Sequence, residues 1–203
     1  MTMKTLNLFL LMSLLFCSSM TWSQSDSNPV RLRGTIVSMT DTVMTIKERS
    51  GESMNLTINA NLGVQEVFPI NKSEILPNAF IGSAAVTGSD GKLKALEVHV
   101  FPEASRGTGE GHRPWDLGPQ STMTNATVSQ LLKNAGNVEV NVQYKGGEKT
   151  IVIDDNTPVV TYKPGDKSLL VPGASVFLMA VKKGEQFEVQ RVSVGRNGFK
   201  PPM

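Results

Sequence analysis

The sequence predicts an all-β protein built from two copies of one five-stranded β-barrel. Short stretches alternate between apolar and polar residues with a period of two, which is typical of half-buried strands. Turns that contain glycine separate these stretches. The two halves of the chain also match each other at an offset of 95 residues. Such a long period indicates a duplicated domain, because solenoid repeats have periods of about 20–50 residues.

The first segment, residues 1–23, has the features of a secretory signal peptide. Lys4 supplies a positive charge, Leu6–Phe16 is apolar, and Thr21 and Ser23 supply the small residues of a cleavage site. The apolar run is about 11 residues long, and a transmembrane helix needs roughly 20. We therefore expect the leader to be cleaved, and we expect no contact with a membrane except through it.

The only cysteine, Cys17, lies within this leader. Bacterial lipoproteins are cleaved before such a cysteine but need a small residue ahead of it, and Phe16 is bulky. Cleavage after Ser23 would leave a chain without cysteine, whereas secreted animal domains commonly carry disulfides. We therefore expect a periplasmic or secreted protein without a lipid anchor.

The matches between the two halves fall on glycines, prolines and alternate apolar positions. At the offset of 95, Gly51 coincides with Gly146 and Pro77 with Pro172. Residues of these types determine where turns form and which side chains enter a core. The chain is therefore expected to contain two domains of one design.

The first domain is predicted to span residues 30–101. Its five expected strands are Val30–Thr40, Val43–Arg49, Ser53–Asn59, Ala79–Thr87 and Lys94–Phe101. Pro69 and Pro77 are expected to exclude a central strand from the long connection between the third and fourth strands. Within that connection, Lys72–Leu76 is suited to a helical turn.

The second domain is predicted to span residues 122–196. Its expected strands are Thr124–Leu132, Val138–Tyr144, Glu148–Asp154, Ala174–Lys182 and Gln186–Val194. In each domain, a meander of three strands precedes a long connection and a hairpin. This order favours an OB-like barrel. An SH3-like barrel or a small sandwich is the alternative.

Three sequence features carry a resemblance to known proteins. These are the opening around Gly34, the SGE hairpin at Ser50–Glu52, and the FPEASRGTGEGHRPWD stretch at Phe101–Asp116. With them the chain resembles small exported bacterial proteins that carry one or two OB-like domains, mostly of unknown function. The resemblance implies the OB-like fold. Some of these proteins are described as linked to metal transport, which would imply a metal ion.

Charged residues are mixed along the chain. There are 20 lysines and arginines and 18 acidic residues; loss of Lys4 with the leader leaves 19 against 18, a net charge of +1. Binding to phosphate backbones requires clustered lysine and arginine, and no basic block occurs. We therefore expect no nucleic-acid partner.

The connector between the domains, residues 102–121, is rich in glycine and proline, which argues against a regular helix or strand there. It also carries Arg106, Arg113, Trp115 and Asp116, an unusual set for a simple spacer. In one interpretation Trp115 packs between the domains while the arginines pair with nearby acids. In another, the same residues bind a ligand or a partner.

A third interpretation of this region is a metal site. His99, Glu103, Glu110, His112 and Asp116 carry the nitrogen and oxygen ligands that zinc, copper or nickel accept. Their spacing follows no diagnostic motif. The alternation of its strand is expected to turn His99 away from the core and into solvent.

Motifs of catalysis are missing from the sequence. No cysteine nucleophile remains after cleavage, and neither a nucleophile elbow nor a phosphate-binding loop occurs. We therefore expect an exported binding or adaptor module without catalytic activity or cofactor, with an unidentified protein or small molecule as its periplasmic partner. The alternative is a periplasmic metal-binding protein that uses the connector histidine and acids.

Overall fold

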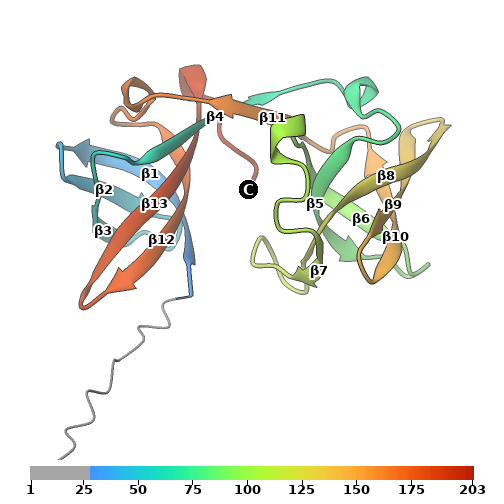
Figure 1. Ribbon diagram of the computed structural model, residues 1–203, viewed down its shortest axis with the longest axis horizontal. Coiled ribbons are helices and arrows are strands. Elements are labelled where there is room, and N and C mark those ends of the chain that lie inside the picture. Colours follow the sequence, from blue (N-terminus) through green and yellow to red (C-terminus); the bar gives the residue numbers. More distant parts are fainter. Residues whose placement is uncertain (1–27) are drawn as a thin grey trace, which may run out of the picture.

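The computed structural model describes residues 28–203, so the predicted leader lies outside the described residues. The described part consists of strands and four short 3-10 helices, which confirms the all-β prediction. None of the helices in residues 28–203 has the length and apolar character needed to cross a membrane. Figure 1 shows two lobes joined by a narrow bridge of strands.

The ten predicted strands are present, with bounds that differ by a few residues. In the first half they are β1 (Val30–Met39), β2 (Val43–Glu48), β3 (Ser53–Thr57), β5 (Phe80–Thr87) and β6 (Leu93–Val100). In the second half they are β8 (Thr122–Asn134), β9 (Asn137–Tyr144), β10 (Gly147–Asp154), β12 (Ser175–Lys183) and β13 (Gln186–Gly195). The expected helical turn is η1 (Lys72–Glu74), and η3 (Lys167–Leu169) is its counterpart in the second half.

Two further strands lie in the long connections of the two halves, the first of them where Pro69 was expected to exclude a strand. These are β4 (Gly63–Pro69) and β11 (Val159–Pro164), and each ends at its proline. A proline at the end of a strand leaves the preceding hydrogen bonds intact, so the prediction for Pro69 was wrong. The connector likewise contains a short strand, β7 (Gly111–Pro114), which pairs with β8 and also ends at a proline.

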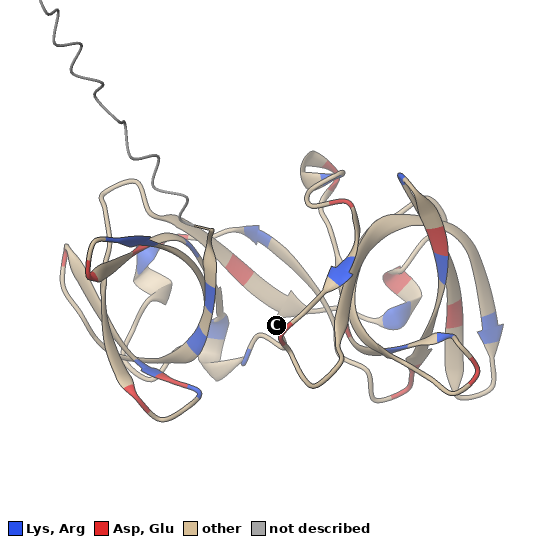
Figure 2. Ribbon diagram, turned by 90° about the horizontal axis from the view of Figure 1, so that it is seen from below, with Lys and Arg blue, Asp and Glu red and all other residues tan. Residues whose placement is uncertain are grey.

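The strands of each lobe close into a ring of five. In ring A the hydrogen-bonded order is β1, β2, β3, β13 and β12, and β12 pairs again with β1. In ring B the order is β8, β9, β10, β6 and β5, and β5 pairs again with β8. The view from below shows the strands of each lobe around a central space, with positive and negative residues scattered over both (Figure 2).

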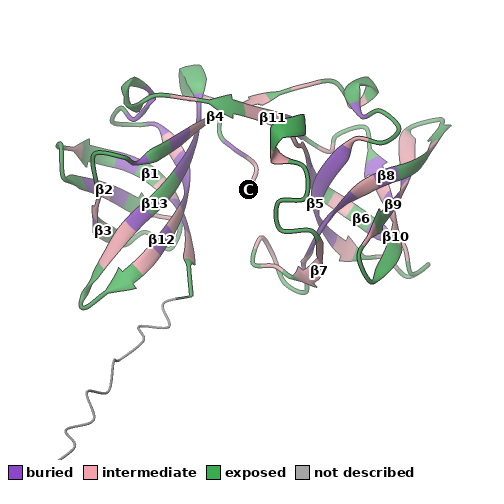
Figure 3. Ribbon diagram, viewed as in Figure 1, coloured by how far each residue is buried: buried purple, intermediate pink, exposed green. Residues whose placement is uncertain are grey.

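Each ring therefore takes three strands from one half of the chain and a hairpin from the other. The predicted domains, residues 30–101 and 122–196, do not describe this grouping. In ring A, Leu32 pairs with Leu178, and both side chains enter one core. In ring B, Ile81 pairs with Ala126. Buried residues lie on the strands of both lobes (Figure 3).

The bridge between the rings consists of β4 and β11, which pair antiparallel. Val67 faces Tyr162 in this pair, and the two residues are 95 positions apart. The two halves of the chain are thus related by a pseudo-twofold axis that passes between them. Because β4 also pairs with β13, and β11 with β6, each bridge strand extends the sheet of a ring. Each half of the chain gives its hairpin to the ring of the other half, and the bridge strands pair directly with these exchanged hairpins.

The turns of the two halves correspond at the predicted offset. Gly51 and Gly146 have φ angles of 98° and 107°, and Asn78 and Gly173 have φ angles of 67° and 88°. All four adopt the left-handed conformation that tight turns require.

The first strand of each half departs from the offset of 95. Ile81 and Val176, which are 95 positions apart, face Ala126 and Gly34, which are 92 apart. The strands β1 and β8 therefore correspond at an offset of 92 residues, three fewer than in the rest of the chain.

Gly34 lies on β1 opposite Glu48 of β2, where the two paired strands approach closely. A Cβ atom added there would lie 2.5 Å from the carbonyl oxygen of Lys47. We expect Gly34→Ala to lower the free energy of unfolding by about 1–3 kcal/mol, because the two strands must separate. Gly118→Ala is the matched control, since a Cβ atom at Gly118 meets nothing within 4 Å. Urea denaturation of both variants measures the effect, and equal stabilities would contradict this packing.

Candidate ligand-binding cavity between the rings

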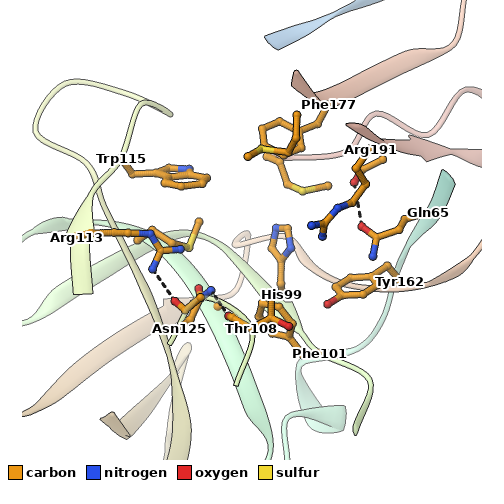
Figure 4. Close-up of a pocket in the computed structure, with 16 residues that line it drawn as sticks. Gln65, His99, Phe101, Thr108, Arg113, Trp115, Asn125, Tyr162, Phe177 and Arg191 are labelled. Carbon is orange, nitrogen blue, oxygen red and sulfur yellow. Dashed lines mark hydrogen bonds between the residues drawn. The ribbon is translucent and has the colours of Figure 1, made fainter. Parts of the chain in front are cut away.

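A cavity of about 180 Å³ lies between the two rings. Ring A contributes Phe177, Met179 and Arg191, and ring B contributes His99 and Asn125. The bridge contributes Gln65 and Tyr162, the connector contributes Thr108, Arg113 and Trp115, and the chain ends at the cavity with Met203. Figure 4 shows side chains from both rings pointing into this space. The cavity exists only because the hairpin exchange and the bridge hold the rings beside each other.

The connector is held to ring B at its start. Arg106 donates hydrogen bonds to the Glu103 carboxylate at 2.6 and 2.8 Å and to the Asn78 carbonyl at 2.8 Å. Arg106 therefore orders the first turn of the connector and does not reach the cavity.

Asp116 joins the connector to ring A. Its carboxylate accepts hydrogen bonds from Arg31 at 2.9 Å and from Arg33 at 2.7 Å. Burial raises the pKa of Asp116, but the two arginines outweigh this effect and hold the pKa below its usual range. Arg33 also donates to the backbone oxygen of Met203 at 2.8 Å. The connector thus spans the gap and closes one side of the cavity.

Trp115 forms part of the wall that the connector contributes. The Arg31 guanidinium lies 4.3 Å from the centre of its ring system and that of Arg113 lies 5.6 Å away, both within the range of cation–π attraction. The side chain is half-buried, with its Nε1 atom inaccessible to solvent. Trp115 therefore packs at the junction of the rings without filling it.

A buried pair of titratable residues lies behind the cavity. Glu97 and His99 project from β6 on the side away from the core of ring B, and their exposed fractions are 0% and 8%. His99 Nε2 lies 3.2 Å from Glu97 Oε2, which is within ion-pair distance, but the angles do not make a hydrogen bond. The expectation that His99 is solvated was wrong, because the second ring covers this face.

Asn125 packs beside Gly82 on the opposite wall. Its Nδ2 atom donates to the Thr108 carbonyl at 2.9 Å, which turns Oδ1 toward Gly82. A Cβ atom at Gly82 would lie 2.7 Å from Asn125 Oδ1 and 2.9 Å from the Phe101 ring. Glycine is therefore needed here for Asn125 and Phe101 to reach the cavity.

Buried polar atoms without a hydrogen-bond partner are concentrated at this one place. In residues 28–203 they are both carboxylate oxygens of Glu97, His99 Nε2, Trp115 Nε1 and Asn125 Oδ1. Three of these residues line the cavity, and Glu97 lies against His99. Unpartnered buried polar groups are rare in folded proteins, and each calls for an explanation. These unpartnered atoms are thus gathered at the junction of the two rings.

The residues of the expected metal set are not brought together. His99 lies against Glu97, and Glu103 pairs with Arg106. Glu110 accepts a hydrogen bond from the backbone N–H of Lys145 at 2.9 Å. Within the described part of the chain, no group of three or more His, Cys, Asp and Glu side chains is arranged to hold a metal ion.

His112 lies on ring B, away from the other histidine. Its Nδ1 atom is 2.8 Å from Thr124 Oγ1, and its ring stacks on Tyr144 with 6.5 Å between the centroids. Burial lowers the pKa of His112, and the nearby Lys149 and Arg113 lower it further. These contacts hold β7 against ring B.

Of the connector residues expected to bind a ligand or join the domains, Arg113 and Trp115 line the cavity, Asp116 joins connector to ring A, and Arg106 stays within ring B. Four residues at the cavity or behind it were not predicted from the sequence: Glu97, Asn125, Tyr162 and Arg191. Each lies on a face of a strand that alternation assigns to solvent. The one signal in the sequence was that equivalent positions of the two hairpins carry opposite charges, Glu97 in the first and Arg191 in the second.

Comparisons of the chain with protein-family models, with curated proteins and with solved structures find no match. The resemblance to exported OB-like proteins therefore finds no support from them.

Proposed function

We propose that this chain is an exported, non-catalytic binding protein whose small-molecule ligand occupies the cavity between the rings. One observation carries the proposal. The unpartnered buried polar atoms of residues 28–203 all lie at this cavity or against a residue that lines it. Leaving such groups unpaired costs about 1–3 kcal/mol each. These atoms are inaccessible to solvent in this arrangement, so a polar ligand that recovers this free energy must shift the side chains that cover them.

We further propose that each ring is an OB-like barrel. Each has a three-strand meander and a hairpin, with one parallel contact between the last meander strand and the second hairpin strand. This arrangement supports the five-stranded barrel expected from the sequence, assembled here from both halves of the chain. The apolar leader at Leu6–Phe16 supports export.

Binding, and not catalysis, is favoured by the contacts of the hydroxyl groups at the cavity. Ser193 Oγ donates to Gln65 Oε1 at 3.4 Å, so it is directed at an amide and not at a histidine. Burial raises the pKa of the Tyr162 hydroxyl, which keeps it protonated. A nucleophile needs a base within hydrogen-bond reach, and His99 instead faces Glu97.

Three single-ring probes of different charge test the proposal: benzyl alcohol, benzoate and benzylamine. At 100 times its dissociation constant, a bound probe adds about 2.7 kcal/mol to the free energy of unfolding. We expect at least one probe to raise the melting temperature of the wild-type protein by several degrees. Ser193→Phe places a ring into the cavity and should abolish that shift.

Leu132→Phe is the matched control for the added ring, because Leu132 is exposed on β8 and does not line the cavity. This variant should keep the full shift. If no probe raises the melting temperature, or if the shift persists in Ser193→Phe, the cavity is not a binding site.

A further inference from the structure

We infer that the ligand is a small carboxylate with an apolar body the size of one ring or a short chain. This inference rests on the proposed function and adds the chemical class of the ligand.

The charge around the cavity favours an anion. Arg113 and Arg191 both line the cavity, and neither makes an ion pair within residues 28–203. Arg31 and Arg33 lie at its edge and share one acid, Asp116. The residues that line the cavity therefore include two arginines and no aspartate or glutamate. An anion between the rings would offset this positive excess.

The two free arginines approach from opposite sides. Arg113 comes from the connector on ring B and donates to the Gly109 carbonyl at 2.7 Å through one nitrogen, which leaves other N–H groups free. Arg191 comes from β13 of ring A and points toward His99 across the cavity (Figure 4). A planar guanidinium and a carboxylate form paired hydrogen bonds, so each of these two side chains is suited to bind a carboxylate.

The rest of the wall is apolar and limits the size of the ligand. Phe101, Phe177, Met123 and Met179 line the cavity together with the face of Trp115. A cavity of about 150 Å³ is known to hold one benzene molecule, so the 180 Å³ found here suits a body of one ring. Methionine and aromatic side chains adapt to flat apolar groups.

Isothermal titration of the full chain with benzoate, benzyl alcohol, benzylamine and inorganic phosphate tests the inference. We expect benzoate to bind about tenfold or more tightly than benzyl alcohol, because hydrogen bonds to a charged group are worth that much. Benzylamine and inorganic phosphate should bind more weakly than benzoate, the first for its charge and the second for its lack of an apolar body.

Arginine variants separate the contributions of charge and shape. Arg191 is exposed apart from its contact with the cavity, so Arg191→Gln should fold normally. It should weaken benzoate about tenfold and leave benzyl alcohol unchanged within about twofold. Arg113→Gln should act in the same direction. Arg49→Gln is the matched control, because Arg49 is exposed and does not line the cavity.

Each outcome decides between the two proposals. If benzyl alcohol or benzylamine binds as tightly as benzoate and Ser193→Phe still abolishes binding, the cavity is a binding site but the carboxylate inference fails. If inorganic phosphate binds as tightly as benzoate, the site selects a free anion, and the apolar body is not part of recognition. Benzoate binding that survives Arg191→Gln and Arg113→Gln also overturns the inference. If no probe binds, both proposals fail.

Discussion

Residues 28–101, produced alone, are expected not to form a folded monomer. In this segment β1, β2 and β3 lack their hairpin, because β12 and β13 complete ring A from the other half of the chain. The missing hairpin supplies six buried apolar residues: Val176, Leu178, Ala180, Val189, Val192 and Val194. Their burial is worth of the order of 10 kcal/mol, comparable with the whole stability of a typical domain. Circular dichroism and size-exclusion chromatography measure the result.

Mixing this segment with residues 102–203 should restore a folded one-to-one complex, because together they contain both rings. A segment that instead pairs with a second copy of itself would repeat the same exchange between chains. A cooperatively folded monomer of residues 28–101 would contradict the exchange, since it requires β5 and β6 to complete their own ring.

The second large effect is expected at the buried Glu97–His99 pair. His99→Ala removes the polar side chain beside a carboxyl group that is 0% exposed. Removing one partner from a buried pair costs about 3–5 kcal/mol, because the other is left unpaired. Urea denaturation should show a loss of this size in the free energy of unfolding.

Replacing both members of the pair provides the control. The double variant Glu97→Met with His99→Leu leaves no buried polar group, so its stability should equal or exceed that of the wild-type protein by about 1–4 kcal/mol. A loss below about 1 kcal/mol in His99→Ala would show that water reaches Glu97. Glu97 and His99 would then not form a buried pair, and Glu97 without its partner would not lower the free energy of unfolding.

The strand positions could be predicted because alternation records which face of each strand is buried. Met44 and Ile46 alternate with less buried neighbours on β2, and both are fully buried. The grouping of strands could not be predicted from the same pattern. Both hairpins carry apolar residues at equivalent positions, so Val98 of ring B and Val192 of ring A fit either core. An exchanged and an unexchanged arrangement bury the same side chains.

The candidate site was predictable only where it lies in the connector. Trp115 and Asp116 are conspicuous in a segment of glycine and proline, and the structure places both at the junction of the rings. The strand residues Glu97, His99 and Arg191 carry no such signal. They face outward from their own ring. Only the packing of one ring beside the other buries Glu97 and His99 and brings Arg191 to the cavity.

A crystal structure of the protein soaked with 4-bromobenzoate tests the central claim most directly, because anomalous scattering locates the bromine without ambiguity. We predict one strong peak in the cavity, with the carboxylate between Arg113 and Arg191 and the ring against Trp115. An empty cavity at saturating 4-bromobenzoate, or a peak only at sites outside the junction of the rings, would contradict the account.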